Sequence, residues 1–108
     1  MEAPESVLLQ LSDILEKRKG SDPETSYASH LFAAGTDTIL QKVGEESIEF
    51  ILAAKGGDQA HLVSEAADVW FHMLVLLSEK GLSAQDILNE LNRRLGTSGI
   101  TEKASRGN

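Results

Sequence analysis

Two short acidic motifs carry the residues of this 108-residue chain that could do chemistry. Residues 45–49 read EESIE, and residues 65–68 read EAAD. Each motif holds two acids three positions apart, which share one face when the segment is helical. If both pairs met between antiparallel helices, the unpaired negative charge would require neutralisation, and carboxylate oxygens are preferred ligands of Mg²⁺. The spacing therefore predicts a divalent-cation site formed by Glu46, Glu49, Glu65 and Asp68.

Solvated helix faces are the alternative interpretation of the same motifs. Repulsion between like charges at these spacings costs only a few tenths of a kcal/mol per exposed pair, so a helix can tolerate it. The apolar and small residues around Glu65 and Asp68 favour a face that meets a neighbouring helix instead. His72, four residues after Asp68, is interpreted either as an outer partner or ligand of the cation, or as a core or interface histidine with one hydrogen-bonded nitrogen. The second case is the more frequent one.

Hydrophobic spacing predicts helices that would position these acids. Apolar residues recur at helical intervals over residues 5–19, 26–34, 36–56, 58–80 and 83–95, and no segment shows the alternation of a strand. The expected N-caps are Ser26, Thr36 or Asp37, Asp58 and Ser83. We therefore expect an all-α bundle of four to five helices. The fourth helix is apolar on more than one side around residues 69–77, which predicts a homodimer.

Charge and composition limit the partners of the chain. The formal net charge is −7, although residues 93–108 hold four basic residues against Glu102, so the body is strongly acidic and the end is basic. This balance argues against general binding to nucleic acid or anionic membranes. The longest apolar run, residues 73–77, is too short to span a bilayer. The absence of cysteine excludes a disulfide framework and a thiolate metal site and is compatible with the cytoplasm, where we expect the protein.

The predicted domain covers residues 1–95, and residues 96–108 form a basic tail for which we expect a loop or a mobile segment.

The two acidic motifs match the EExxE and ExxD signature of the all-α nucleoside triphosphate pyrophosphohydrolase (MazG-like) superfamily. Within it the chain resembles the phosphoribosyl-ATP pyrophosphohydrolase family from Ser26 onward. The similar stretches are SY at 26–27, KVGEE at 42–46, EAAD followed by WFH at 65–72, and SGITEKASR at 98–106.

This resemblance implies Mg²⁺-dependent hydrolysis of phosphoribosyl-ATP to phosphoribosyl-AMP and pyrophosphate, the second step of histidine biosynthesis, with Mn²⁺ as the expected substitute. The four acids named above would be the metal ligands, and Glu45 would orient or deprotonate the attacking water. The expected substrate and phosphate contacts are Ser26, Tyr27, Lys42, Arg93, Arg94, Lys103 and Arg106.

Two other functions and one structural role compete with these assignments. A house-cleaning pyrophosphohydrolase of broader nucleotide range would use the same acids, and a non-catalytic helical dimer would keep only the bundle. The basic residues from Arg93 onward would otherwise serve as helix C-terminal cations and a solvated tail.

Overall fold

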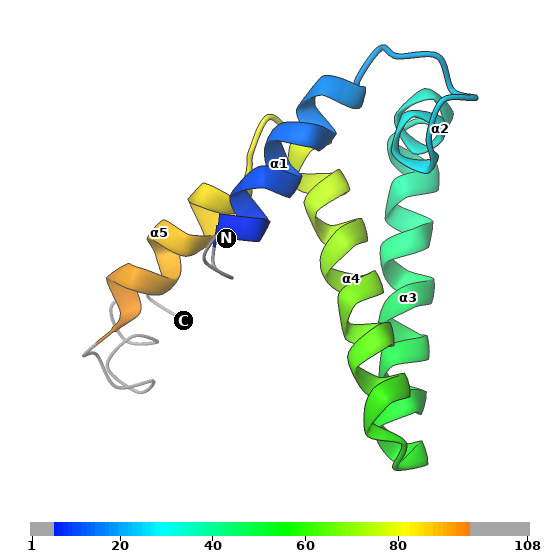
Figure 1. Ribbon diagram of the computed structural model, residues 1–108, viewed down its shortest axis with the longest axis vertical. Coiled ribbons are helices and arrows are strands. Elements are labelled where there is room, and N and C mark those ends of the chain that lie inside the picture. The colour runs from blue at the N-terminus through cyan, green and yellow to red at the C-terminus, as the bar shows by residue number, and fades with distance from the viewer. Residues whose placement is uncertain (1–5, 96–108) are drawn as a thin grey trace.

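The computed structural model describes residues 6–95, which form five helices and contain no strand (Figure 1). The helices are α1 (Ser6–Arg18), α2 (Tyr27–Ala34), α3 (Thr36–Gly56), α4 (Gln59–Glu79) and α5 (Ala84–Arg94). The all-α prediction is confirmed, and the expected helix bounds differ from the observed ones by at most one residue at each end.

Side-chain caps begin three of the helices where the sequence predicted them. The Ser26 hydroxyl accepts a hydrogen bond from the Ser29 amide at 3.0 Å, and the Asp58 carboxylate accepts one from the His61 amide at 3.2 Å. At α5, the amide of Ser83 donates to the Asp86 carboxylate at 2.9 Å, which forms a capping box. These bonds satisfy amides that have no partner within the helix.

The expected cap of α3 is wrong. Neither Thr36 nor Asp37 caps this helix; its N-cap is Gly35, which has a φ of 101° and no side-chain cap bond. Gly35 serves here because α2 and α3 meet at this single residue, and a positive φ favours glycine. The Thr36 hydroxyl instead donates to the Glu79 carboxylate at 2.7 Å, which ties the start of α3 to the end of α4.

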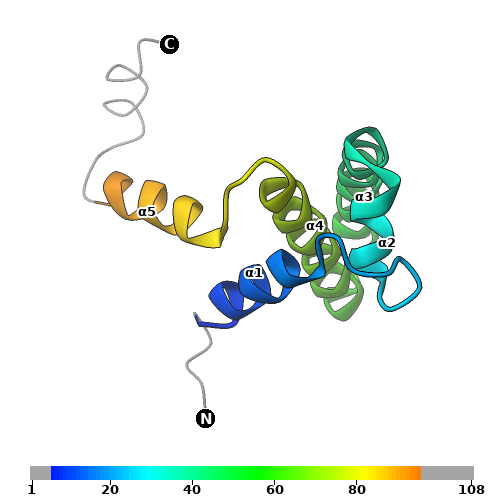
Figure 2. The same ribbon diagram turned by 90° about the horizontal axis from the view of Figure 1, so that it is seen from above.

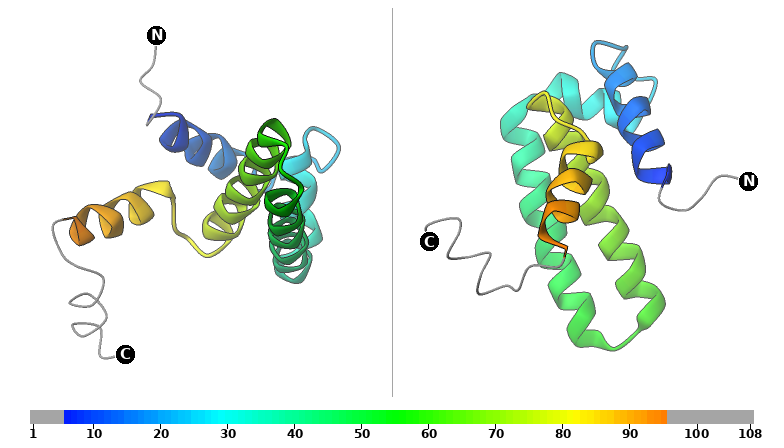
Figure 3. Two further views of the ribbon diagram at one scale, coloured as in Figure 1. Left: turned by 90° about the horizontal axis from the view of Figure 1, so that it is seen from below. Right: turned by 90° about the vertical axis from the view of Figure 1, so that its left-hand side faces the viewer.

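The helices α3 and α4 form a long antiparallel hairpin that turns at Gly57, whose φ is 83° (Figure 1). The helices α1 and α5 leave one end of this hairpin on the same side, as Figure 2 and Figure 3 show. Ser12 of α1 accepts a hydrogen bond from the Ala84 amide at 2.9 Å, which holds the start of α5 against α1.

The buried core lies at the end of the hairpin where α1 and α2 pack. It consists of Leu15, Ala28, Leu31, Ile39, Leu74, Val75 and Ala84. Farther along the hairpin, several large apolar side chains are exposed, among them Leu52 at 61%, Val63 at 68% and Trp70 at 55%. Within residues 6–95, half of the hairpin thus has two helices but no third layer to cover it.

By length and composition alone, α4 would pass for a membrane-spanning helix, the one such segment within residues 6–95. This is weak evidence, because α4 carries Glu65 and Asp68 near its middle and packs along α3. An uncovered apolar face on a helix that bears two acids fits contact with protein better than contact with lipid.

Candidate metal centre

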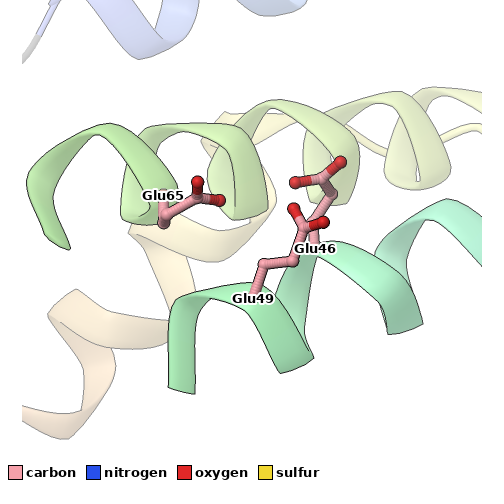
Figure 4. Close-up of side chains that lie close together, drawn as sticks. All are labelled: Glu46, Glu49 and Glu65. Atoms are coloured by element: carbon pink, nitrogen blue, oxygen red, sulfur yellow. The ribbon is translucent and has the colours of Figure 1, made fainter. Parts of the chain in front are cut away.

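Three carboxylates converge between α3 and α4. Glu46 and Glu49 project from α3 toward α4, and Glu65 projects from α4 into the same space (Figure 4). Each offers an oxygen within 4.8 Å of the others. The antiparallel hairpin produces this approach because it brings the two acidic motifs to the same level. The structure thus gathers three of the four predicted ligands, here called the acidic cluster.

The acidic cluster is short of compensating charge. Burial raises the pKa of Glu46, and the neighbouring Glu49 raises it further by its charge and by a hydrogen bond. The Glu65 side chain is only 16% exposed, and its Oε2 atom is buried without any hydrogen-bond partner. Among the described residues, no lysine or arginine forms an ion pair with these three acids. A hard divalent cation satisfies such a set of oxygens.

Asp68 stands apart from the acidic cluster. It is exposed on α4, one turn after Glu65, and is not among the three acids that approach one another. Its charge still acts on Glu46, where burial is the main cause of the raised pKa and Asp68 adds to it. Its role as a fourth ligand stays a prediction.

Glu45 and Lys42 lie beside the acidic cluster on α3. The Glu45 side chain is exposed, and its Oε1 lies 4.0 Å from the Lys42 Nζ. Lys42 therefore forms its ion pair with Glu45 rather than with Glu46 or Glu49. An exposed carboxylate next to a metal site has access to solvent water, and a flexible ammonium has access to an incoming phosphate.

Tyr27 and His72 are joined by a hydrogen bond of 2.8 Å between Tyr27 Oη and His72 Nε2. His72 is buried, and its Nδ1 lies 2.7 Å from the backbone oxygen of Asp68. Partial burial raises the pKa of Tyr27. The positive charge of Lys42 opposes this rise, and the negative charges of nearby carboxylates add to it, with Glu46 contributing most among them. The tyrosine hydroxyl therefore lies within the field of the acidic cluster.

The Ser26 hydroxyl is committed to the cap of α2. It accepts from the Ser29 amide and lies 2.9 Å from the Ser29 hydroxyl, to which it donates. These bonds leave it less available to a substrate phosphate than the sequence suggested.

An open pocket of about 480 Å³ lies beside Glu49 and Glu65 and is also lined by His61. His61 is not among the site residues predicted from the sequence. Its Nδ1 lies 4.0 Å from Glu65 Oε1, and the four-residue spacing between them was the signal that could have revealed it.

Arg93 and Arg94 lie on α5, which extends away from the hairpin (Figure 1). Both contact Glu90, at 2.8 Å and 2.9 Å, and these hydrogen bonds lower the pKa of Glu90 to about 2. The structure does not bring the two arginines to the acidic cluster of the same chain. Lys103, Arg106 and the predicted tail of residues 96–108 lie outside the described residues.

Comparison with known proteins reveals relatives over almost the whole chain. A phosphoribosyl-ATP pyrophosphatase of Methylococcus capsulatus is 54% identical over 100 residues, which cover 93% of this chain and 95% of the relative. Proteins of the same name from Methylibium petroleiphilum and Burkholderia multivorans are each 51% identical. These matches cover 94% and 97% of this chain, and 85% and 90% of the respective relatives.

The sequence model of the phosphoribosyl-ATP pyrophosphohydrolase family matches residues 8–95, which include helices α2 to α5 in full and α1 from its third residue. The match spans both acidic motifs and the hairpin that brings them together. The chain therefore belongs to the phosphoribosyl-ATP pyrophosphohydrolase family.

Proposed function

We propose that this protein hydrolyses phosphoribosyl-ATP to phosphoribosyl-AMP and pyrophosphate, the second step of histidine biosynthesis, in the cytoplasm. Its relatives at 51–54% identity carry the name of this activity. The observation that carries the proposal is the acidic cluster, where Glu65, whose buried Oε2 has no hydrogen-bond partner, approaches Glu46 and Glu49.

Mg²⁺, with Mn²⁺ as a substitute, is the cofactor that the cluster suits. Glu46, Glu49 and Glu65 would hold it, with Asp68 as the further ligand predicted from the sequence. When bound, the cation would neutralise phosphate oxygens and the charge that develops on them during hydrolysis. A polyphosphate could not otherwise approach so acidic a surface.

The remaining residues of the site have separate roles in the proposal. Glu45 orients or deprotonates the attacking water, because its exposed carboxylate lies next to Glu46 and beside solvent. Lys42 contacts a phosphate oxygen from the same side of α3. The water oxygen forms a new bond to the α- or β-phosphorus, and the bond from that phosphorus to the bridging oxygen breaks. If the α-phosphorus is attacked, pyrophosphate leaves with the bridging oxygen; if the β-phosphorus is attacked, phosphoribosyl-AMP leaves with it and the water oxygen ends in pyrophosphate.

A homodimer is part of the proposal. The half of the hairpin that has no third layer within residues 6–95 carries exposed apolar side chains. These are Ile48, Ile51 and Leu52 on α3, and Val63 and Trp70 on α4. A second copy of the hairpin would bury these side chains and complete a four-helix arrangement. Such an assembly is isologous, so one apolar face serves both chains.

Pyrophosphate release from phosphoribosyl-ATP by the purified protein tests the activity. We expect turnover with Mg²⁺, none with a chelator, and none in Glu49→Gln. The control Glu24→Gln removes one charge from the exposed loop between α1 and α2 and should retain full activity. Absence of pyrophosphate release would overturn the proposal, whereas comparable turnover of deoxynucleoside triphosphates would identify a house-cleaning enzyme instead.

A further inference from the structure

His72 forms hydrogen bonds with both ring nitrogens, and these bonds assign its proton. The Nδ1 atom lies 2.7 Å from the backbone oxygen of Asp68, which can only accept. The Nδ1 atom must therefore carry a hydrogen. In the neutral imidazole the other nitrogen is then an acceptor, so Nε2, 2.8 Å from Tyr27 Oη, receives the tyrosine proton.

This assignment fixes what the Tyr27 hydroxyl can offer to other groups. Its single proton is directed to His72, and only lone pairs remain on the oxygen. The ring is held in place by Phe71, which stacks on it at 6.0 Å, and by His72, which meets it edge-on at 5.6 Å. An oxygen of this kind accepts hydrogen bonds and repels the oxygens of a phosphate.

The surroundings of the hydroxyl indicate which donor it meets. Through His72, the Tyr27 hydroxyl is joined to the backbone of Asp68, one turn after Glu65 on α4. Tyr27 is 47% exposed, and the charges of Lys42, Glu46 and Asp68 act on it. Carboxylates offer no proton to it, and the Lys42 ammonium lies 4.0 Å from the Glu45 carboxylate. Mg²⁺ retains several water molecules when it binds to proteins, and these waters are strong donors.

We propose that His72 is a positioning residue that fixes the Tyr27 hydroxyl as a hydrogen-bond acceptor for a water molecule in the hydration shell of the cation. Tyr27 then does not donate to a substrate phosphate, in contrast to the contact expected from the sequence. The water contact rests on the proposed function, whereas the orientation of Tyr27 by His72 does not.

Nuclear magnetic resonance of the metal-free, ¹⁵N-labelled protein tests the orientation directly. The chain has three histidines, and His72→Phe identifies the His72 signals by their loss. At about pH 8, where an ordinary histidine is neutral, we expect a proton on Nδ1 of His72 and none on Nε2. Tyr27→Phe should shift the Nε2 signal of His72 and leave His30 and His61 unchanged. A proton on Nε2 would overturn the proposal.

Kinetics with Mg²⁺ test the water contact. Loss of one hydrogen bond should lower kcat by about tenfold in Tyr27→Phe, with the KM for phosphoribosyl-ATP changed by less than about twofold. His72→Phe should have the same effect, and the double variant should be no worse than either single one. The control His30→Phe changes an exposed histidine of α2 and should leave both constants unchanged.

Two results would contradict this role, and a third separates it from the proposed function. A raised KM with kcat retained would make Tyr27 a phosphate donor, and additive losses would make the two residues independent. If His72→Phe does not fold, Tyr27→Phe, a change at a half-exposed residue, still distinguishes a raised KM from a lowered kcat. If the wild type fails to bind Mg²⁺ in a titration, the water contact falls with the proposed function, and the resonance data still decide the orientation.

Discussion

Replacing Glu65 with glutamine should stabilise the metal-free protein while removing its response to Mg²⁺. The substitution keeps the shape of the side chain and deletes one of three charges that lie within 4.8 Å of one another. At that distance, two unit charges repel by about 0.9 kcal/mol in water and by about 3.5 kcal/mol at an effective dielectric constant of 20.

The expected gain lies near the lower of these limits. Glu49 is exposed, so solvent screens part of its repulsion with the other two carboxylates. The amide of the new glutamine can also donate to either neighbour. We therefore expect the free energy of unfolding in chelator to rise by about 1–2 kcal/mol, a shift of several degrees in Tm for a domain of this size.

Urea unfolding followed by the fluorescence of Trp70 measures this change. With Mg²⁺ at 100 times its Kd, the wild type should gain about 2.7 kcal/mol, and Glu65→Gln should gain much less. The control Glu24→Gln removes the same charge from an exposed loop and should respond to Mg²⁺ as the wild type does. A variant that is less stable in chelator and equally stabilised by Mg²⁺ would refute the view of Glu65 as an unpaired metal ligand.

Further predictions concern the neighbouring residues. Asp68→Asn should weaken Mn²⁺ affinity by at least about tenfold in a calorimetric titration if Asp68 is the fourth ligand; unchanged affinity would remove it from the site. Because the pKa of Glu46 is raised in the folded state, proton binding by this group stabilises the fold fully at a pH below the ordinary Glu pKa of 4.5. This stabilisation is lost as the pH rises through the raised pKa. In urea unfolding without metal, the wild type should therefore lose stability over that pH range relative to Glu46→Gln. Trp70→Glu should convert the proposed dimer to a monomer in light scattering, since it places a charge on the exposed face of α4. Arg93→Ala should raise the KM by about tenfold if this arginine binds phosphate, and an unchanged KM would exclude that role.

The helices and the approach of the acidic motifs were accessible from the sequence because both depend on local spacing. Ser26, Asp58 and Ser83 cap helices as their residue types predict, and the glycines at 56 and 57 mark the turn of the hairpin. Once that turn is known, an antiparallel pair must bring residues 46–49 opposite residues near 65.

Other features depend on tertiary contacts that spacing does not specify. Tyr27 and His72 are 45 positions apart in the chain, and nothing local indicates that their side chains meet. The three-residue spacing of Glu65 and Asp68 places them on one helix face but does not determine which of them points at α3. The direction of α5, and with it the position of Arg93, depends on its packing against α1.

Anomalous scattering from crystals grown with Mn²⁺ tests the central claim most directly, because it locates the cation without reference to activity. We expect a peak between α3 and α4, within bonding distance of oxygens of Glu46, Glu49 and Glu65. A bound Mn²⁺ elsewhere, or an empty acidic cluster at a concentration that supports turnover, would contradict it.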